Sequence, residues 1–277
     1  MPRLQNTSNG SDPQPPNLGG WIDRPWAAFL FFTRLPLWRI HQPRKECYNS
    51  VVEWWPLVGW LTGGTMAAVL YWGAQVLPWS VTVLAAIAVR LLLTGALHED
   101  GLADFMDGFG GGGSDRQRIL DIMKDSHIGT YGVLGLVVYL ALLFVLLYNM
   151  PPQFAALTVL AADPYAKMLA GQVIQMMPYA RTEQTAKART VYRRMSTVSA
   201  LLLAVQGLLP VVLYLYYFRD TIDWQYPIFI PCLVMYFLYR LIWSRLRGYT
   251  GDCCGALFLL VELSFYITIV VMLRLVS

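Results

Sequence analysis

The sequence predicts an all-α integral membrane protein with about seven transmembrane helices, a cytoplasmic N-terminus, and cytoplasmic loop helices that carry the functional site. Hydrophobic residues make up 56% of the chain and charged residues only 14%, whereas soluble domains carry about 25% charged residues. The apolar residues also gather in runs of about 20, the length that crosses the hydrocarbon core of a bilayer. Together these two observations exclude a soluble globular fold.

The predicted elements begin after a polar tail. Residues 1–20 are rich in Pro, Gly and Asn and are predicted to be disordered, and residues 21–277 are predicted to form a single polytopic membrane domain. The segment 25–38 is too short and too interrupted to span, and its aromatic residues indicate an interfacial helix. Seven hydrophobic segments predict the spans: 55–76, 79–97, 128–148, 154–175, 197–218, 226–243 and 254–276.

The distribution of Lys and Arg predicts the orientation. An N-terminus in the cytoplasm places the segments 1–54, 98–127, 176–196 and 244–253 on that side. With Arg240 at the border, these segments hold 17 of the 21 basic residues. Because cytoplasmic loops carry an excess of Lys and Arg, this asymmetry favours the N-terminus inside and the C-terminus outside. The expected location is a bacterial cytoplasmic (inner) membrane.

The segment 98–127 concentrates acidic residues beside predicted spans. Asp100, Asp104 and Asp107 are spaced i, i+4, i+7, which places them on one face of a helix. Three like charges at a membrane boundary repel one another and are costly to desolvate, and no basic residue stands close in sequence to compensate. Oxygen ligands without cysteine favour Mg²⁺, with Mn²⁺ as the alternative. A solvated acidic face is the competing interpretation, and the interspersed glycines and apolar residues weigh against it.

The residues after this acidic run predict a hinge and a second short helix. The run "GGGG" is not followed by Gly-Lys-Ser/Thr, so a flexible hinge fits it better than a phosphate-binding loop. Ser114 or Asp115 can cap the helix that follows. Asp121 and Asp125 form a second acidic pair at i, i+4, and Lys124 between them is a candidate phosphate contact.

A few polar residues fall inside the predicted spans. Asp163 and Lys167 are spaced i, i+4 and can neutralise each other, which predicts a structural pair. Glu262 lies deep in the last span, where a carboxyl group is a functional hypothesis by default and a hydrogen-bonded, protonated carboxyl is the alternative. Cys253 and Cys254 form no spaced metal pattern and are predicted to be buried packing residues.

The acidic run belongs to a set of motifs that resembles the cobalamin synthase family, the adenosylcobinamide-GDP ribazoletransferases. "HEDGLADFMDG" followed by "MKDSHIGTYG" looks like the signature of that family. Further matches are "FTRLP" at 32–36, "WPLVGWLTG" at 55–63, "MPYAR" at 177–181 and "GYTGDCCGA" at 248–256. These motifs cover most of the chain after residue 25 and keep the order of the family.

The resemblance implies a divalent-metal-dependent transfer. The family joins adenosylcobinamide-GDP to α-ribazole or its 5′-phosphate and releases GMP, a phosphoryl-type reaction. In such reactions the protein mainly positions the groups and stabilises charge. The resemblance and the carboxylate pattern together make Asp100, Asp104 and Asp107 the expected metal ligands, with Glu99 as a weaker candidate.

The resemblance also implies candidates for proton transfer. His98 is the candidate general base for the attacking hydroxyl, because an imidazole titrates near neutral pH. A hydrogen-bonded histidine at the membrane boundary is the competing interpretation. Asp125 is a second candidate base or ligand, and Lys124 is expected to contact phosphate.

Two further cytoplasmic segments are expected to complete the site. Arg181, in the shared "MPYAR" motif, suits a diphosphate clamp. Thr250 can cap the last helix and leave its N-terminal amides facing an anion, and Asp252 beside it is a candidate metal or ribose contact. The loop after Arg181 holds four more basic residues: Lys187, Arg189, Arg193 and Arg194. The excess of Lys and Arg in cytoplasmic loops explains them as well as phosphate binding does.

Other membrane functions predict different patterns. A CDP-alcohol phosphotransferase is the nearest alternative, but its motif carries Arg soon after Asp-Gly, where this chain has Asp104. A prenyltransferase is weaker because the Asn-Asp opening of its motif is missing. A transporter would distribute carboxylates at mid-depth, whereas here they cluster at one boundary. The expected partners are the two substrates, the lipid bilayer and other cobalamin assembly enzymes, and no feature predicts binding of nucleic acid.

Overall fold

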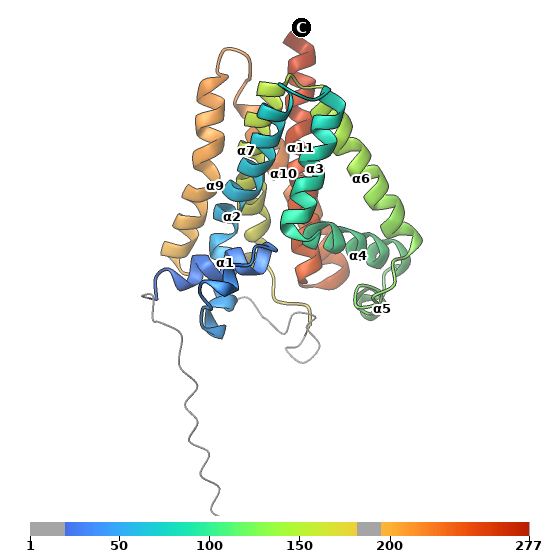
Figure 1. Ribbon diagram of the computed structural model, residues 1–277. Helices are drawn as coiled ribbons and strands as arrows, with labels where there is room; N and C mark the ends of the chain where they lie inside the picture. Colours follow the sequence, from blue (N-terminus) through green and yellow to red (C-terminus); the bar gives the residue numbers. More distant parts are fainter. Residues whose placement is uncertain (1–19, 182–194, 277) are drawn as a thin grey trace, which may run out of the picture.

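A computed structural model describes residues 20–181 and 195–276, which form a bundle of long helices (Figure 1). Within these ranges the structure has no β-strand beyond one isolated bridge, so the predicted all-α class is confirmed. Residues 1–19, most of the predicted tail, lie outside the described residues. The α-helices are α1 Asp23–Phe32, α2 Trp55–Gly73, α3 Trp79–Thr94, α4 Leu97–Gly111, α5 Arg116–Ile122, α6 Thr130–Tyr148, α7 Pro152–Gly171, α8 Val173–Met176, α9 Thr197–Tyr217, α10 Gln225–Leu246 and α11 Gly251–Val276.

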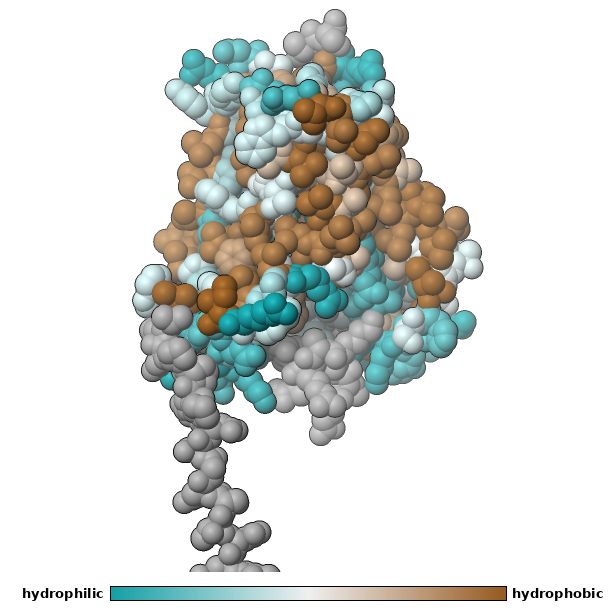
Figure 2. Space-filling model, in the orientation of Figure 1, coloured by the Kyte–Doolittle hydropathy of each residue, from teal (hydrophilic) through white to brown (hydrophobic). Residues whose placement is uncertain are grey.

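One long helix occupies each of the seven predicted hydrophobic segments: α2, α3, α6, α7, α9, α10 and α11. In the described part of the chain, α6, α9, α10 and α11 are each long and apolar enough to cross a membrane. The bent pair α3 and α4 makes a fifth candidate if it counts as one span. Figure 2 shows hydrophobic side chains as a broad belt between two more hydrophilic ends. The fold is therefore that of a multi-pass membrane protein.

A sharp turn separates α3 from α4. Gly95 and Ala96 both have left-handed backbone angles, with φ of 65° and 54°, and the two helices meet at 89°. A Cβ atom on Gly95 would lie 2.1 Å from the Arg34 Nε atom, so both the angle and the space require glycine. The helix predicted over 79–97 therefore ends at Thr94, and α4 runs across the end of the bundle (Figure 1).

Glycines allow α2 and α7 to pack closely. A Cβ atom on Gly59 would lie 2.7 Å from the Asp163 Oδ1 atom, and one on Gly63 would lie 3.1 Å from a backbone oxygen of α7. Small residues four apart are a common way for membrane helices to approach each other. At this contact Asp163 forms an ion pair with Lys167 and accepts a hydrogen bond of 2.8 Å from Thr62. The predicted structural pair is confirmed.

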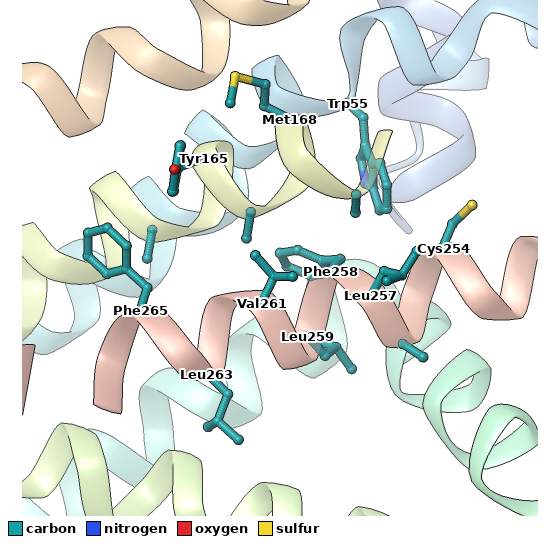
Figure 3. Packing of buried hydrophobic residues seen from close by; sticks show 14 of the residues in the cluster. Trp55, Tyr165, Met168, Cys254, Leu257, Phe258, Leu259, Val261, Leu263 and Phe265 are labelled. Atoms are coloured by element: carbon teal, nitrogen blue, oxygen red, sulfur yellow. The ribbon is translucent and has the colours of Figure 1, made fainter. Parts of the chain in front are cut away.

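Helix α11 forms the centre of the bundle, and most of its length is buried. Its side chains Phe258 and Val261 pack against α7 (Figure 3). Cys253 and Cys254 are buried near its start, which confirms their predicted packing role. Helices α1, α4 and α5 lie at one end of the bundle, and the last turns of α11 reach the opposite end (Figure 1).

Helix α1 begins at Asp23, two residues before the segment 25–38 that was predicted as interfacial, and it ends at Phe32, inside that segment. A short 3-10 turn at Leu37–Arg39 follows Pro36, and proline disfavours the helical conformation of the residue before it. The chain then folds back, because the His41 ring nitrogen Nε2 lies 2.7 Å from the Asp23 Oδ1 atom. This buried contact joins the start of α1 to the chain that leads into the 3-10 segment Lys45–Trp54, which packs against α1 just before α2 begins.

Candidate active site

Helix α4 crosses α11 with almost no side chain between the two backbones. A Cβ atom on Gly101 would lie 3.2 Å from the Cα and carbonyl oxygen of Asp252, and one on Gly255 would lie 3.2 Å from the carbonyl oxygen of His98. Glycine at both positions is what permits this approach. The crossing places the first turn of the acidic helix beside the first turn of α11, although about 150 residues separate them in sequence.

A cavity of about 170 Å³ opens at this crossing. Four residues singled out by their sequence motifs line it: His98, Asp100, Arg181 and Asp252. They come from three separate segments of the chain, the acidic motif, "MPYAR" and "GYTGDCCGA". Apolar and aromatic side chains form another part of the lining: Phe31, Phe32, Val52 and Trp55. Two carboxylates, a guanidinium and an imidazole therefore share one enclosed space.

Aromatic rings surround His98. Its ring centroid lies 6.1 Å from that of Phe32 and 5.7 Å from that of Trp55, both nearly parallel, and 4.8 Å from that of Phe258, which meets it edge-on. The side chain is 3% exposed, and its Nε2 atom has no hydrogen-bond partner among the described residues. A buried ring nitrogen without a partner is costly unless a ligand satisfies it. His98 therefore lines the cavity with a ring that still has one nitrogen without a hydrogen-bond partner among the described residues.

Glu99 points away from this cavity and toward a buried ionic network. Its Oε1 atom lies 3.9 Å from the Arg90 guanidinium. Arg90 Nη1 donates to both carboxylate oxygens of Glu262, at 2.9 and 2.7 Å, and Nη2 donates to the Tyr139 hydroxyl at 2.6 Å. The Tyr266 hydroxyl donates to Glu262 at 2.8 Å. The carboxyl group deep in the last span thus has an arginine partner, which the sequence analysis did not pair with it.

Asp107 joins α4 to α6. Its Oδ2 atom accepts from the Gly129 amide at 2.7 Å, and its Oδ1 atom accepts from the Gly132 amide at 2.8 Å. A carboxylate that accepts from the free amides of a helix N-terminus is a strong cap. Neither Asp107 nor Asp104 lines the cavity. Asp104 is partly buried on the same helix.

Three of the four carboxylates predicted as metal ligands therefore lie in different surroundings. Asp100 faces the cavity, Glu99 faces Arg90 and Asp107 caps α6. Across the described ranges no group of three or more His, Cys, Asp or Glu side chains is arranged to hold a metal ion. The pair that does share a space is Asp100 with Asp252, from two different helices. The metal ligands remain a prediction.

Asp125 and Lys124, the two candidate residues that follow α5, lie in different surroundings. Asp125 is exposed; it accepts from the His127 amide at 3.0 Å and lies 2.7 Å from the His127 ring nitrogen Nδ1. The hydrogen bond from the His127 side chain lowers the pKa of the Asp125 carboxyl. Asp125 lies outside the lining of the cavity, whereas Lys124 lines a neighbouring pocket together with Arg181.

Backbone pairing brings Arg181 to the cavity. The segments around Tyr179 and Tyr249 form a parallel bridge, in which the Ala180 amide donates to the Tyr249 carbonyl at 2.8 Å and the Tyr249 amide donates to the Pro178 carbonyl at 3.0 Å. Arg181 Nη2 then donates to the Leu120 carbonyl of α5 at 3.0 Å. This bridge holds the "MPYAR" motif against the residues that precede α11.

Thr250 caps α11 as predicted, because its Oγ1 atom accepts from the Cys253 amide at 3.3 Å. It does not line the cavity itself. Lys187, Arg189, Arg193 and Arg194 lie outside the described residues. The sequence analysis gave no role to Phe32 and Trp55, although each is the first residue of a motif it quoted, "FTRLP" and "WPLVGWLTG". Their place in two motifs shared with the family was the sequence feature from which their part in the cavity lining could have been predicted.

Fold and site define a class: a multi-pass helical membrane protein with a charged cavity at one end of the bundle, formed by its acidic helix and the start of its last helix. The chain belongs to the cobalamin-5-phosphate synthase family, whose sequence model matches residues 24–270. The family resemblance drawn from the motifs is confirmed.

Curated relatives cover almost the whole chain. A protein of Leptospira interrogans is 31% identical over 88% of this chain and 94% of its own length. One of Vibrio parahaemolyticus is 35% identical over 88% and 90%, and one of Shewanella baltica is 34% identical over 90% and 94%. Each of these is named adenosylcobinamide-GDP ribazoletransferase. No solved structure matches the chain.

Proposed function

We propose that this protein is an adenosylcobinamide-GDP ribazoletransferase, which joins adenosylcobinamide-GDP to α-ribazole or α-ribazole 5′-phosphate and releases GMP. Family membership and the names of the relatives support the reaction. The observation that carries the site is the cavity in which Asp100, Asp252 and Arg181 meet. A diphosphate needs both a cation from the protein and oxygen ligands for a counter-ion, and this cavity offers both.

The reaction is a displacement at phosphorus. A ribose hydroxyl oxygen of the acceptor forms a bond to the phosphorus nearest the cobinamide arm, and the bond from that phosphorus to the oxygen bridging to GMP breaks. The hydroxyl proton passes to a base, and GMP leaves with the bonding electron pair. The protein contributes positioning and charge stabilisation to such a transfer.

Each cavity residue has a role in this proposal. Arg181, fixed by its hydrogen bond to α5, stabilises the negative charge on the phosphate oxygens. His98 is the base that accepts the hydroxyl proton: its Nε2 atom has no partner among the described residues, and burial lowers its pKa, so the ring is uncharged before the reaction. The aromatic wall of Phe32 and Trp55 gives an apolar surface to a ring of the substrate. Asp125, exposed and paired with His127, is the weaker candidate base.

The cavity also fits a divalent ion. Mg²⁺ is usually held by one or two carboxylates and completes its coordination with water and substrate phosphate. Asp100 and Asp252 supply two carboxylates to one cavity, and hard oxygen ligands of this kind suit Mg²⁺. They are the residues that would hold Mg²⁺ (or Mn²⁺), which would neutralise charge on the diphosphate.

We also propose the topology that the loop charges predict: seven spans, the N-terminus in the cytoplasm, and residence in a bacterial inner membrane. Helices α1, α4 and α5 share one end of the bundle, and the last turns of α11 reach the other (Figure 1), as an odd number of crossings requires. The cavity then faces the compartment that supplies nucleotide-activated substrates, where other cobalamin assembly enzymes are the expected neighbours.

The proposal is tested with purified protein in detergent or lipid. Adenosylcobinamide-GDP, α-ribazole and Mg²⁺ are supplied, and the cobalamin product and GMP are measured by mass. We expect product with Mg²⁺, none with a chelator, and a loss of at least a hundredfold in Asp252→Asn, because that change removes one of two carboxylates facing the substrate. A folded wild type that makes no product but turns over CDP-alcohol substrates would replace this function with that of the alternative class.

A further inference from the structure

A second pocket lies beside the cavity, and Arg181 lines both. It measures about 260 Å³ and lies between α5 and the residues Ala180 and Arg181. Three cationic side chains line it, Arg116, Lys124 and Arg181, together with one carboxylate, Asp121. The neighbouring cavity holds two carboxylates and one cation, so the two spaces have opposite balances of charge.

Backbone carbonyls hold the two arginines of this pocket in place, and no carboxylate among the described residues forms an ion pair with them. Arg116 Nε donates to the Leu246 carbonyl and Nη2 donates to the Ala180 carbonyl, both at 2.7 Å. Arg181 Nη2 donates to the Leu120 carbonyl at 3.0 Å. Backbone carbonyls orient a guanidinium but carry no net charge, so both arginines keep their full positive charge.

The single carboxylate of the pocket does not cancel these charges. Asp121 Oδ1 accepts from the Gln117 side chain at 2.9 Å. Among the described residues, Arg116, Lys124 and Arg181 form no ion pair with any carboxylate. Three cations in one recess repel one another, and an anion between them relieves that repulsion. Fixed guanidinium forks match the oxygens of a phosphate group in particular.

We propose that this pocket binds a phosphate group of a substrate, next to the cavity where the reaction takes place. The inference rests on the proposed function for the identity of the substrate and adds a place for one of its phosphates. The phosphate has two possible sources: the 5′-phosphate of the acceptor and the diphosphate of the donor. Arg181, which borders both spaces, joins the pocket to the reacting centre.

The variant that tests the pocket is Lys124→Gln. Lys124 is exposed and makes no side-chain hydrogen bond in the described structure, so its removal leaves the fold intact. Arg118→Gln is the matched control, because Arg118 is an exposed cation of α5, six residues before Lys124, and does not line the pocket. Both variants change the net charge by the same amount. A difference between them therefore reports a local contact in the pocket and not a change in the overall electrostatic potential of the protein.

Steady-state kinetics distinguish the two sources of phosphate. If the acceptor supplies it, Lys124→Gln raises the KM for α-ribazole 5′-phosphate roughly tenfold to a hundredfold, the loss expected for one charge-assisted hydrogen bond, and leaves the KM for α-ribazole near its wild-type value. If the donor supplies it, the KM for adenosylcobinamide-GDP rises with either acceptor. Lys124→Arg is expected to recover most of the loss. Unchanged KM values for all three substrates would overturn the proposal.

A binding experiment separates this proposal from the proposed function. Inorganic pyrophosphate is titrated calorimetrically into wild type, Lys124→Gln and Arg118→Gln at constant ionic strength. We expect roughly tenfold weaker binding in Lys124→Gln only. A wild type that binds pyrophosphate in this Lys124-dependent way but makes no cobalamin supports the pocket and rejects the activity. Equal binding by all three proteins rejects the pocket, whatever the activity.

Discussion

The buried pair of Arg90 and Glu262 gives the sharpest test of how this bundle is held together. Arg90 is 3% exposed and Glu262 is fully buried. Replacing Arg90 with Met removes two hydrogen bonds to Glu262 and one to Tyr139, and it leaves Glu262 with Tyr266 as its remaining partner. Removing one member of a buried ion pair costs about 3–5 kcal/mol, because the other charge stays buried without compensation.

The measured quantity is the apparent Tm in detergent, followed by the fraction that elutes as a folded monodisperse protein after heating. A loss of that size lowers the Tm by roughly 6 to 20 °C, at about 2–4 °C for each kcal/mol in a chain of this size. Arg219→Met is the control, because Arg219 is an exposed cation, with a side chain 63% exposed. We expect its Tm to stay within a few degrees of wild type, since exposed ion pairs contribute at most about 1 kcal/mol.

The double variant Arg90→Met/Glu262→Gln decides the mechanism. It removes both charges and keeps an acceptor for the Tyr266 hydroxyl, so it should recover at least half of the Tm lost in Arg90→Met. If Arg90→Met unfolds at the wild-type temperature, or if the double variant is no more stable than Arg90→Met, the pair does not stabilise the bundle in the way argued here.

Three further results are expected. Asp107→Asn replaces an oxygen that accepts from an α6 amide and should cost about 1–2 kcal/mol of stability. Asp220→Asn, at a side chain that is 92% exposed, should cost less, and equal losses in a thermal-unfolding comparison would reject the cap. Gly101→Ala forces α4 away from the Asp252 backbone and should lower kcat at least tenfold. Gly111→Ala is the control, because a Cβ atom there meets only the end of one side chain, and its kcat should stay near the wild-type value. Similar kcat values for the two variants would contradict the close crossing. Chelation of Mg²⁺ should abolish turnover and leave the apparent Tm within a few degrees, and activity that survives chelation would reject the metal.

Much of this protein could be predicted from local sequence patterns. Long apolar runs give membrane helices wherever the chain provides them, because an unsatisfied backbone in lipid is costly and a helix satisfies it internally. The acidic run forms α4, and Thr250 caps α11 as its position suggested. The pairing of Asp163 with Lys167 was also visible, since residues four apart on a helix are neighbours. These features depend on residues within one or two turns of each other.

The direction in which each acidic side chain of α4 points was decided only by tertiary structure. The i, i+4, i+7 spacing placed Asp100, Asp104 and Asp107 on one helix face, but it could not show what that face meets. The chain turns by 89° at Gly95 and Ala96, so α4 lies against α11 at its start and against α6 further along. Asp100 therefore reaches the cavity, and Asp107 reaches the amides of α6.

Contacts between distant segments were likewise invisible in the sequence. Arg90 and Glu262 are 172 residues apart, and Arg181 reaches the cavity through a backbone bridge between Tyr179 and Tyr249. The sequence by itself determined which residues are charged, which segments form long apolar helices and which family the motifs resemble. Only the packing of α4, α7 and α11 determined which charges meet, because a contact in space depends on how helices cross and not on their order in the chain.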